Sequence, residues 1–507
     1  MLAGGGRAHT DESAYKPASG VRGTALAINL STLMPTLPHP LQRASMALSL
    51  ASLAGCATSV ELNELVLLHR AGAEDAVVER LRDDDVKEEL RGDRDGLLWR
   101  LEAGKILQDA GRIEESERQF RAADVRMREF DAEPIIRVGG ELGALITNPA
   151  ARAYRGTEYD RILLECYRVW NHLVLGDLSE ALVHCRRAFV RQSEALERNA
   201  ERVVEEQRAA KEHRLELSEL VGGSRFEETV APSRTRVDPT YADWVNPYAT
   251  WLQGVLQWID EDYDRAEVDL RKLAGMHPES PGVAALLAEV EGGAVAAVPG
   301  MTRVFFIHEA GDAPSRAEAS FVLQTPRFGY TPIVFPVLLY EARQPGSFEV
   351  TDPAGALLAT SETISNFEAI VANDYETRLA GVVLRAFLSV ILKETATEAL
   401  VEVDRKEDGR EDGWGLLVGN LYKIASAGCD TRTWRSPGAR IEVAHFLIPS
   451  GEVAQMHLLD PVGTRIASYQ TEPQTAPVLF VRVRSHGGGA VSIQTATLGG
   501  PNSSTQP

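Results

Sequence analysis

From residue 60 to about residue 278, apolar side chains recur at the spacing of an amphipathic helix. They fall at i, i+3, i+4 and i+7, and proline is scarce, which together predict a succession of packed helices. A long helix laced with charges is expected over residues 178–217. Residues 221–246 contain a Gly-Gly pair and Pro232, so they are expected to form a loop or crossover.

Three parts of this helical segment share one spacing of small and apolar residues. In each, a small or slim residue on the first helix precedes a small residue on the second by twelve positions, and apolar or small residues follow four and seven positions later. The positions are Gly104, Ser116, Phe120 and Ala123; Val169, Ala181, Cys185 and Ala188; and Gly254, Ala266, Leu270 and Leu273. This spacing is typical of the tetratricopeptide repeat (TPR). An ordinary helical bundle is the alternative.

The glycines of these repeats have specific expected roles. Gly111 and Gly176 follow the first helices of two units, where a left-handed C-cap suits glycine. Gly254 is expected at a close crossing of two helices. Leucine at this position should cost about 1–3 kcal/mol through overpacking, whereas alanine should be tolerated because it favours the helix.

A linker rich in Ala, Gly and Val, at residues 292–300, separates the helices from a segment with the pattern of strands. Apolar runs bounded by Gly and Pro turns predict strands at residues 302–307, 333–340, 347–351, 441–448, 453–458 and 478–483. Two helices, over residues 367–400 and 416–427, interrupt this set. The sequence therefore predicts an α+β protein. An N-terminal TPR-like α-helical array is followed by an antiparallel sheet or β-sandwich-like domain with a helical insertion.

The N-terminal segment has a different pattern. Arg43 precedes a short apolar run at residues 44–53, and the sequence then continues to Cys56 through small residues. These features predict a secretory signal peptide, with an amphipathic helix as the alternative. The Leu-Ala-Gly-Cys ending resembles a bacterial lipobox, which implies that Cys56 carries a diacylglyceryl group and becomes the first residue. We expect translation to begin at Met34, because a lipoprotein signal starts close to the N-terminus.

Sequence features, charge and hydropathy limit the expected cellular location of the protein and the classes of partner it could bind. Ala57 follows the cysteine in place of the aspartate of inner-membrane lipoproteins, so the resemblance implies a periplasm-facing outer-membrane lipoprotein. The net charge of −20 repels nucleic acid and anionic headgroups, so neither is expected as a partner. The longest apolar stretch, residues 379–392, is interrupted by Arg385 and is shorter than the ~20 residues of a membrane span. Membrane attachment is therefore expected through the lipid alone.

These assignments predict the following organisation. The leader and signal peptide occupy residues 1–56, the TPR-like helical domain residues 57–291, the linker residues 292–300, the β-rich domain residues 301–498 with its helical insertion at about residues 366–427, and a disordered tail residues 499–507.

The remaining cysteines, Cys166, Cys185 and Cys429, are odd in number, which argues against a disulfide framework. Cys166 and Cys185 are expected to be buried thiols, with a disulfide across a helix hairpin as the alternative. His172 and His184 lie near them in sequence. The neighbours His184 and Cys185 point about 100° apart on a helix, so we expect no metal site there and no cofactor.

The most unusual polar cluster is formed by Asp430, Arg432 and Trp434. As a binding site, it would clamp a peptide or glycan. As a structural cluster, which we favour, Asp430 caps a turn, Arg432 pairs with an acid, and Trp434 fills the joint between helix and sheet. The candidate acids for Arg432 are Asp430, Glu362 and Glu368.

Two further groups are candidates of the same kind. Tyr154 and Glu158 flank Gly156, which permits a sharp turn, and Glu158 favours the N-terminus of the next helix. His308 and Glu309 end a predicted strand and are expected to form a satisfied surface pair.

Several blocks, in order along the chain, resemble a family of poorly characterised bacterial outer-membrane lipoproteins with TPR-like helices and a C-terminal β-rich domain. The blocks are residues 97–104, 154–161, 246–248, 361–370 and 430–434. The resemblance implies a role in the cell envelope, near the lipoproteins that activate penicillin-binding proteins.

The function predicted is that of a non-enzymatic scaffold, which binds a periplasmic or outer-membrane protein during peptidoglycan synthesis or envelope assembly. The alternative is an envelope enzyme acting on peptidoglycan or glycan, with its site between the helical and β domains. Buried carboxylates converging in a cleft would favour the enzyme. An open groove lined with apolar and amide side chains would favour the scaffold.

Overall fold

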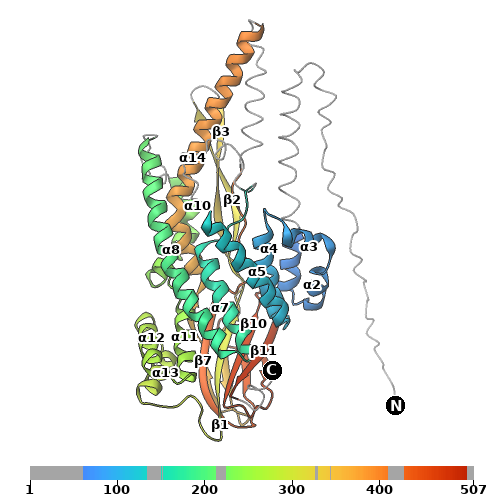
Figure 1. The fold of residues 1–507 in the computed structure, drawn as a ribbon, viewed down its shortest axis with the longest axis vertical. Coiled ribbons are helices and arrows are strands. Elements are labelled where there is room, and N and C mark those ends of the chain that lie inside the picture. The colour runs from blue at the N-terminus through green and yellow to red at the C-terminus, as the bar shows by residue number, and fades with distance from the viewer. Residues whose placement is uncertain are drawn as a thin grey trace, which may run out of the picture. The chain divides into compact units, whose positions relative to one another are not determined.

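The computed structural model describes residues 61–133, 150, 152–212, 224–325, 329–342, 344–408 and 428–499, and it shows a mixed α+β fold (Figure 1). Three predicted features lie outside the described residues: the signal peptide with Met34 and Cys56, the helix at residues 416–427, and the tail beyond residue 499.

Helices dominate the first part of the described chain, where residues 61–70 are also helical. The elements that follow are α2 (Glu74–Arg80), α3 (Asp84–Arg91), α4 (Gly96–Asp109), α5 (Ile113–Ala132), α7 (Glu158–Val174), α8 (Leu178–Glu212), α10 (Ser224–Arg234), the 3₁₀ helix η3 (Pro239–Trp244), α11 (Pro247–Ile259), α12 (Tyr263–Met276) and α13 (Pro281–Glu291). A further long helix, α14 (Phe367–Asp408), lies between strands in the sequence.

Three helix pairs, α4 with α5, α7 with α8, and α11 with α12, are joined by tight turns. Gly111 and Gly176 occupy the left-handed region in the first two turns, with φ of 72° and 75°, as the sequence predicts. In the third turn Glu261 takes the same conformation, with φ of 62°. A residue with a Cβ is uncommon there.

The expected close crossings are present at two glycines. A Cβ built on Gly104 would lie 2.4 Å from the ring of Phe120, and one on Gly254 would lie 2.9 Å from two side-chain carbons of Leu270. A methyl group at Gly254 would require a small shift of the flexible Leu270 side chain, and the nearest backbone atom is 3.6 Å away. The expectation that alanine is tolerated there stays a prediction.

The strands form three sheets. They are β1 (Met301–Ala310), β2 (Ser315–Thr325), β3 (Gly329–Leu339), β4 (Phe348–Thr351), β5 (Leu357–Thr360), β6 (Glu362–Asn366), β7 (Arg440–Pro449), β8 (Gln455–Leu459), β9 (Arg465–Gln470), β10 (Val478–Ser485) and β11 (Val491–Leu498). A five-stranded sheet has the order β11-β10-β1-β7-β6, a four-stranded sheet the order β5-β4-β8-β9, and β2 pairs with β3.

The five-stranded sheet is mixed rather than antiparallel. Its central strand β1 pairs antiparallel with β7 but parallel with β10, with Phe305 opposite Phe480 in the parallel pair. The expectation of a purely antiparallel sheet is wrong at this pair. A parallel pair needs a long connection, and here that connection contains the other two sheets and α14.

Successive side chains of β1 point to opposite faces of the sheet, and the core is therefore divided into two parts. Val304 and Phe306 face a cluster shared with Phe348 and Met456 of the four-stranded sheet. On the other side, Phe305 belongs to the large cluster that also contains the buried side chains of the helices. The tryptophans of α11, Trp251 and Trp258, pack edge-on against Phe305, with ring centroids 6.2 Å apart in each pair. The helices and the sheet therefore share one core across residues 292–300, which contain no helix or strand.

Two local expectations differ from the structure. Residues 221–246, expected as a loop, include α10 and η3, and Pro232 lies inside α10. Phe226 of α10 packs against Phe335 of β3, with ring centroids 5.3 Å apart, so tertiary packing outweighs the local signal of proline.

The strands β2, β5, β6, β9 and β11 have no counterpart among the predicted strands. Several of their residues are partly or fully exposed, for example in β5 and β9, so they lack the apolar runs used to find the others.

Candidate functional site

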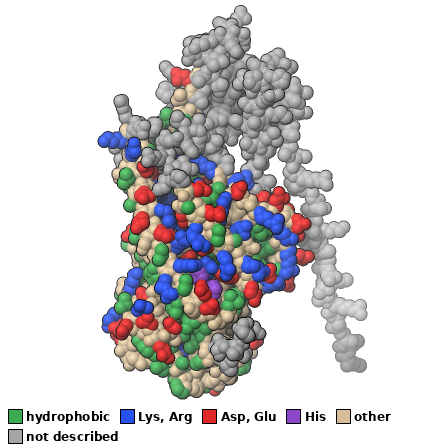
Figure 2. Space-filling view, viewed as in Figure 1, with side chains coloured by type: hydrophobic (Ala, Val, Ile, Leu, Met, Phe, Trp, Pro, Cys, Tyr) green, Lys and Arg blue, Asp and Glu red, His purple; other side chains and the backbone are tan. Residues whose placement is uncertain are grey.

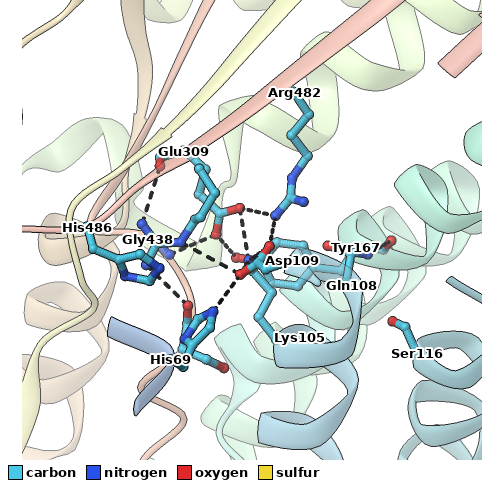
Figure 3. A network of polar contacts seen from close by, with 12 residues as sticks. His69, Lys105, Gln108, Asp109, Ser116, Tyr167, Glu309, Gly438, Arg482 and His486 are labelled. Atoms are coloured by element: carbon cyan, nitrogen blue, oxygen red, sulfur yellow. Dashed lines mark hydrogen bonds and ion pairs between the residues drawn. The ribbon is translucent and has the colours of Figure 1, made fainter. Parts of the chain in front are cut away.

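A network of buried charged side chains lies where α4 and α7 meet the five-stranded sheet (Figure 3). Its central carboxylates are Asp109 at the end of α4 and Glu309 on β1. Arg482 of β10 donates to both of them, at 2.6 Å in each case. Lys105 Nζ lies 2.6 Å from Asp109 Oδ1 and 3.2 Å from Glu309 Oε2. The hydroxyl of Tyr167 donates to Glu309 at 2.6 Å.

The same network continues along the end of the sheet. Arg484 donates to Asp312 at 2.9 Å, and His486 Nδ1 lies 2.7 Å from the same carboxylate oxygen. His69 Nε2 lies 3.0 Å from Asp109, and its ring meets that of His486 edge-on, with centroids 4.6 Å apart. We call these nine residues the junction network: His69, Lys105, Asp109, Tyr167, Glu309, Asp312, Arg482, Arg484 and His486.

Burial fixes the charge states in the junction network. Burial lowers the pKa of His69, and burial with a nearby arginine lowers the pKa of His486 to about 3, so both rings are neutral at pH 7. Burial alone would raise the pKa of Glu309. Lys105 and Arg482 beside it bring that pKa down to about 2, so Glu309 is ionised.

Every side chain of the junction network belongs to a residue that is at most 5% exposed. Charges buried to this extent are costly unless they are paired, and removal of one partner leaves another uncompensated. The junction network therefore attaches the helices to the sheet and offers no accessible group to a substrate.

A second set of buried charges lies between α5, α7 and α8. We call it the groove cluster: Glu117, Asp124, Glu165, Arg168, His172, His184 and Arg191. Arg168 donates to Glu117 at 2.6 Å, and Arg191 donates to Asp124 at 2.8 Å. Arg191 Nε also lies 3.9 Å from Glu165. The helical register places these polar groups on the faces that the three helices turn toward one another.

Three members of the groove cluster, Asp124, Glu165 and Arg191, form the floor of an open groove of about 420 Å³. The groove is lined by Asp124, Arg128, Asp131, Glu165, Arg187, Val190, Arg191, Glu194, Glu197, Arg198 and Glu201. Four of these on α8 are exposed at the rim, namely Arg187, Val190, Glu197 and Glu201. On the face shown in Figure 2, charged side chains of both signs cover the helices in the middle of the view, and the strand-rich part below carries more apolar surface.

Several polar atoms of the groove cluster have no hydrogen-bond partner among the described residues. They are His172 Nε2, Glu165 Oε1 and Arg168 Nη1. Buried polar groups in folded proteins are nearly always paired. The junction network has such atoms as well, His69 Nδ1 and Arg484 Nε, so the open groove over Asp124, Glu165 and Arg191 is what makes the groove cluster the better candidate for binding.

The two sets of buried charges are connected through amides. Gln108 of α4 donates to Asn171 at 2.7 Å, and Asn171 donates to Glu117 at 3.3 Å. Gln108 is the neighbour of Asp109 in the junction network, so a polar layer runs from the sheet through α4 and α7 to the groove.

The predicted cluster at Arg432 has the arrangement expected of a structural ion pair. Arg432 donates to Asp430 at 2.8 and 2.7 Å and to Asp95 at 2.6 Å. Its guanidinium also lies 5.7 Å from the centre of the Tyr154 ring. Glu362 and Glu368, the other expected partners, are engaged elsewhere. Glu362 accepts from the N-terminus of α13, and Glu368 pairs with Arg236. The predicted pairings of Arg432 with these two acids are therefore wrong.

Trp434 is fully buried. Its ring centroid lies 6.1 Å from that of Phe120 and 5.5 Å from that of Tyr167, and its N–H donates to Ser436 at 2.9 Å. The side chain thus fills a joint between helices and the chain that leads into β7. This packing is of the kind that the structural interpretation predicts.

Tyr154 and Glu158 flank the start of α7 but contact different partners. The Tyr154 hydroxyl donates to Asp160 at 2.8 Å, and Asp160 with Thr157 forms a capping box that begins the helix. Glu158 accepts from Arg198 of α8 at 2.6 Å. Gly156 has φ of 72°, which explains the need for glycine in this turn.

The cysteines and the pair on β1 complete the predicted residues. Cys166 and Cys185 are free, buried thiols, and Cys429 is also buried and free. The sequence predicts His308 and Glu309 on the surface, but they are only 0% and 1% exposed. The error arises because both faces of β1 are covered, so alternation along this strand does not bring a residue to the surface.

The sequence alone does not single out the groove cluster or the junction network. A weak signal exists in β10, where Arg482 and Arg484 alternate with Val481 and Val483 in a strand that is buried along its whole length. The partner of Arg482, Asp109, lies 373 residues away. No local pattern indicates such a pairing.

Comparison of this chain with protein-family models, with curated proteins and with solved structures finds no match. The assignment of function therefore rests on the geometry of the site.

Proposed function

We propose that this chain is a non-enzymatic, lipid-anchored scaffold of the bacterial cell envelope, whose groove between α5, α7 and α8 binds a partner protein. The observation that carries the proposal is the open groove itself, in which a floor of buried ion pairs is bordered by exposed charged side chains of α8. A scaffold needs an accessible surface held in a fixed shape. Buried ion pairs such as that between Arg168 and Glu117 hold the three helices together from within.

The helix pairs support a TPR-like array as part of this proposal. Ser116 donates to the carbonyl of Gly104 at 2.7 Å, which ties the small residues of one crossing together. Helical repeats of this kind present extended surfaces to protein partners. The partner segment should carry charges of both signs, because the exposed rim of α8 offers Arg187 toward one end of the groove and Glu197 and Glu201 farther along the helix.

Attachment to the membrane is proposed to occur through lipid on Cys56. Among the described residues, no helix combines the length and hydropathy needed to cross a membrane. Replacement of Cys56 by alanine should release the protein from the membrane fraction and abolish labelling with palmitate. Labelling that persists in this variant would contradict the anchor without affecting the groove.

The groove is tested by cross-linking. A photoreactive amino acid in place of Val190, which is 54% exposed in the groove, should cross-link a partner protein in intact cells. The same amino acid in place of Val462, which is 85% exposed in the turn between β8 and β9, is the matched control. The Val190 product should disappear when Glu197 and Glu201 are changed to lysine. A product that is identical from both sites, or that survives the charge reversal, would contradict the proposal.

One observation favours the alternative of an envelope enzyme. Asp124 and Glu165 are buried carboxylates, 2% and 1% exposed, and both line the groove. Arg191 lies beside both, an arrangement more typical of structural ion pairs than of a proton donor and its base. Incubation of the purified protein with peptidoglycan decides between the two. Fragments released by the wild type but not by Glu165→Gln would establish the enzyme in place of the scaffold.

A further inference from the structure

Three side chains from three different helices converge at one end of the groove cluster. They are Glu117 of α5, His172 of α7 and His184 of α8, and one ligand atom from each lies within 4.8 Å of the others. His172 Nε2 lies 3.7 Å from Glu117 Oε1. Tetrahedral zinc with bonds of about 2.0–2.1 Å to nitrogen holds its ligand atoms about 3.4 Å apart. The separations therefore exceed the tetrahedral spacing by about 1.4 Å at most.

The orientation of His184 is that of a metal ligand with an outer carboxylate. Its Nδ1 lies 2.6 Å from Glu165 Oε2, and both residues are 1% exposed. In the tautomer that donates Nδ1–H to this carboxylate, Nε2 carries the lone pair that a metal ion would use. Metal-bound histidines in proteins almost always donate their other N–H to such a partner.

His172 supplies the second independent observation. It is 8% exposed, and its Nε2 has no hydrogen-bond partner in the part of the chain that the structure describes. Its ring stacks against that of His184, with centroids 5.1 Å apart and an angle of 19° between the planes. Two imidazole rings thus lie side by side next to a carboxylate.

The remaining contacts of Glu117 leave room for a cation. Arg168 donates twice to Oε1, at 3.0 and 2.6 Å, and Asn171 donates to Oε2 at 3.3 Å. A carboxylate offers about four acceptor positions. Among the buried charges of the groove cluster, three carboxylates face two guanidinium groups, and the exposed Arg128 also pairs with Asp124 at 2.9 Å. The carboxylates are Glu117, Asp124 and Glu165, and the guanidiniums are Arg168 and Arg191.

We propose that Glu117, His172 and His184 form a binding site for Zn²⁺ or a similar borderline divalent metal ion, with Glu165 orienting His184. Two imidazoles and a carboxylate suit such ions better than they suit Mg²⁺ or Ca²⁺, which prefer oxygen ligands. A bound ion would join α5, α7 and α8, and its ligand His184 contacts Glu165 of the groove floor. The site does not depend on the proposed partner, so either proposal can fail without the other.

The test uses the full-length protein, freed of metal by dialysis against a chelator. Calorimetric titration with Zn²⁺ should show one ion bound per chain, and Co²⁺ should give the visible absorption of a tetrahedral site. His172→Gln and His184→Gln should each weaken binding by at least tenfold. His457→Gln, which removes a histidine of the four-stranded sheet that bonds to Ser468, is the matched control and should bind as the wild type does. Glu165→Gln should weaken binding by about 10–100-fold if it acts as the outer partner.

Circular dichroism shows whether each variant is folded. Should a histidine variant fail to fold, Glu117→Gln takes its place with the same titration. Zn²⁺ should also raise the melting temperature of the wild type and not that of the variants. An absence of Zn²⁺ and Co²⁺ binding in the wild type, or unchanged affinity in every ligand variant, would overturn the proposal. The second outcome would place the ion elsewhere and leave His172 as a structural neighbour of Glu117.

Discussion

The junction network and the groove cluster are both buried sets of charged side chains, yet they differ in what surrounds them. In the junction network, Arg482 bridges Asp109 and Glu309 between helix and sheet, and no member is more than 5% exposed. Both sets contain polar atoms without hydrogen-bond partners among the described residues, such as Arg484 Nε and Glu165 Oε1, but in the groove cluster Glu165 lines an open groove that is bordered by exposed side chains of α8. Burial of charge alone therefore does not mark a site of function. An unpaired polar atom beside an open surface is the better indicator.

The largest effect is expected in the junction network. Arg482→Met should lower the free energy of unfolding by about 3–5 kcal/mol, because Asp109 and Glu309 lose a shared buried partner. Urea denaturation measures the change. Lys87→Met, which breaks an exposed pair with Asp84, is the control and should cost less than about 1 kcal/mol. A similarly small loss in the free energy of unfolding for both variants would contradict a structural role for the junction network.

The second effect is a dependence of stability on pH. His69 and His486 are neutral in the fold because burial lowers their pKa, that of His486 to about 3, whereas both take up a proton near pH 6.5 when unfolded. The unfolded state therefore binds more protons below pH 6.5. Stability should fall by about 1.4 kcal/mol per pH unit on account of His486 as the pH decreases from 6.5 toward 3, and His69 should add to the loss in the same direction.

Glu309, with a pKa of about 2 in the fold, adds to the loss below about pH 4.5. Unfolding in urea at pH 7.0, 5.5 and 4.5 measures the slope. His486→Asn keeps a donor for Asp312 but does not titrate, so its slope should be smaller. An identical slope in the variant would show that the acid sensitivity lies outside the junction network.

A third, intermediate effect concerns Arg432, which is partly exposed. Arg432→Ala should cost about 1–3 kcal/mol, between the values for exposed and buried ion pairs. A double-mutant cycle should find coupling between Arg432 and Asp95 and none between Arg432 and Glu362. If Arg432→Ala keeps full stability but no longer binds the partner at the groove, the cluster around Arg432 would have a binding role and not a structural one.

Local features of the fold could be predicted from the sequence, and distant contacts could not. The spacing around Gly104 and Gly254 predicts close helix crossings, because small residues at a fixed interval let two helix backbones approach each other, and both crossings are present. The edge strand β9 is missed because most of its side chains face solvent. Its position depends on pairing with β8 rather than on its own hydrophobicity.

The candidate metal site is even harder to predict from the sequence. His172 and His184 are close enough in sequence to be noticed, but Glu117 joins them only through the packing of α5 against α7. Proximity in sequence groups the histidines with Cys166 and Cys185, and both cysteines instead pack as buried thiols. A ligand set drawn from three helices depends on how the helices cross. One sequence does not contain that information in any local pattern.

The smallest effect on stability should accompany the largest effect on binding. Glu197 and Glu201 are exposed on α8 at the rim of the groove. Reversing both to lysine should change the free energy of unfolding by no more than about 0.5 kcal/mol, as is usual for surface positions. The same change should reverse the charge that meets the partner.

The central claim is that the groove binds the partner whereas the junction network only stabilises the fold. Its most direct test is the photo-cross-linking yield at Val190 in three proteins that carry the same photoreactive residue. These are the otherwise unchanged protein, the Glu197→Lys/Glu201→Lys variant and the Arg482→Met variant, each assayed at a temperature at which it is folded. The yield should fall at least tenfold in the groove variant and remain unchanged in the junction variant. An unchanged yield in the groove variant, or an equal loss in the folded junction variant, would contradict the assignment of binding to the groove.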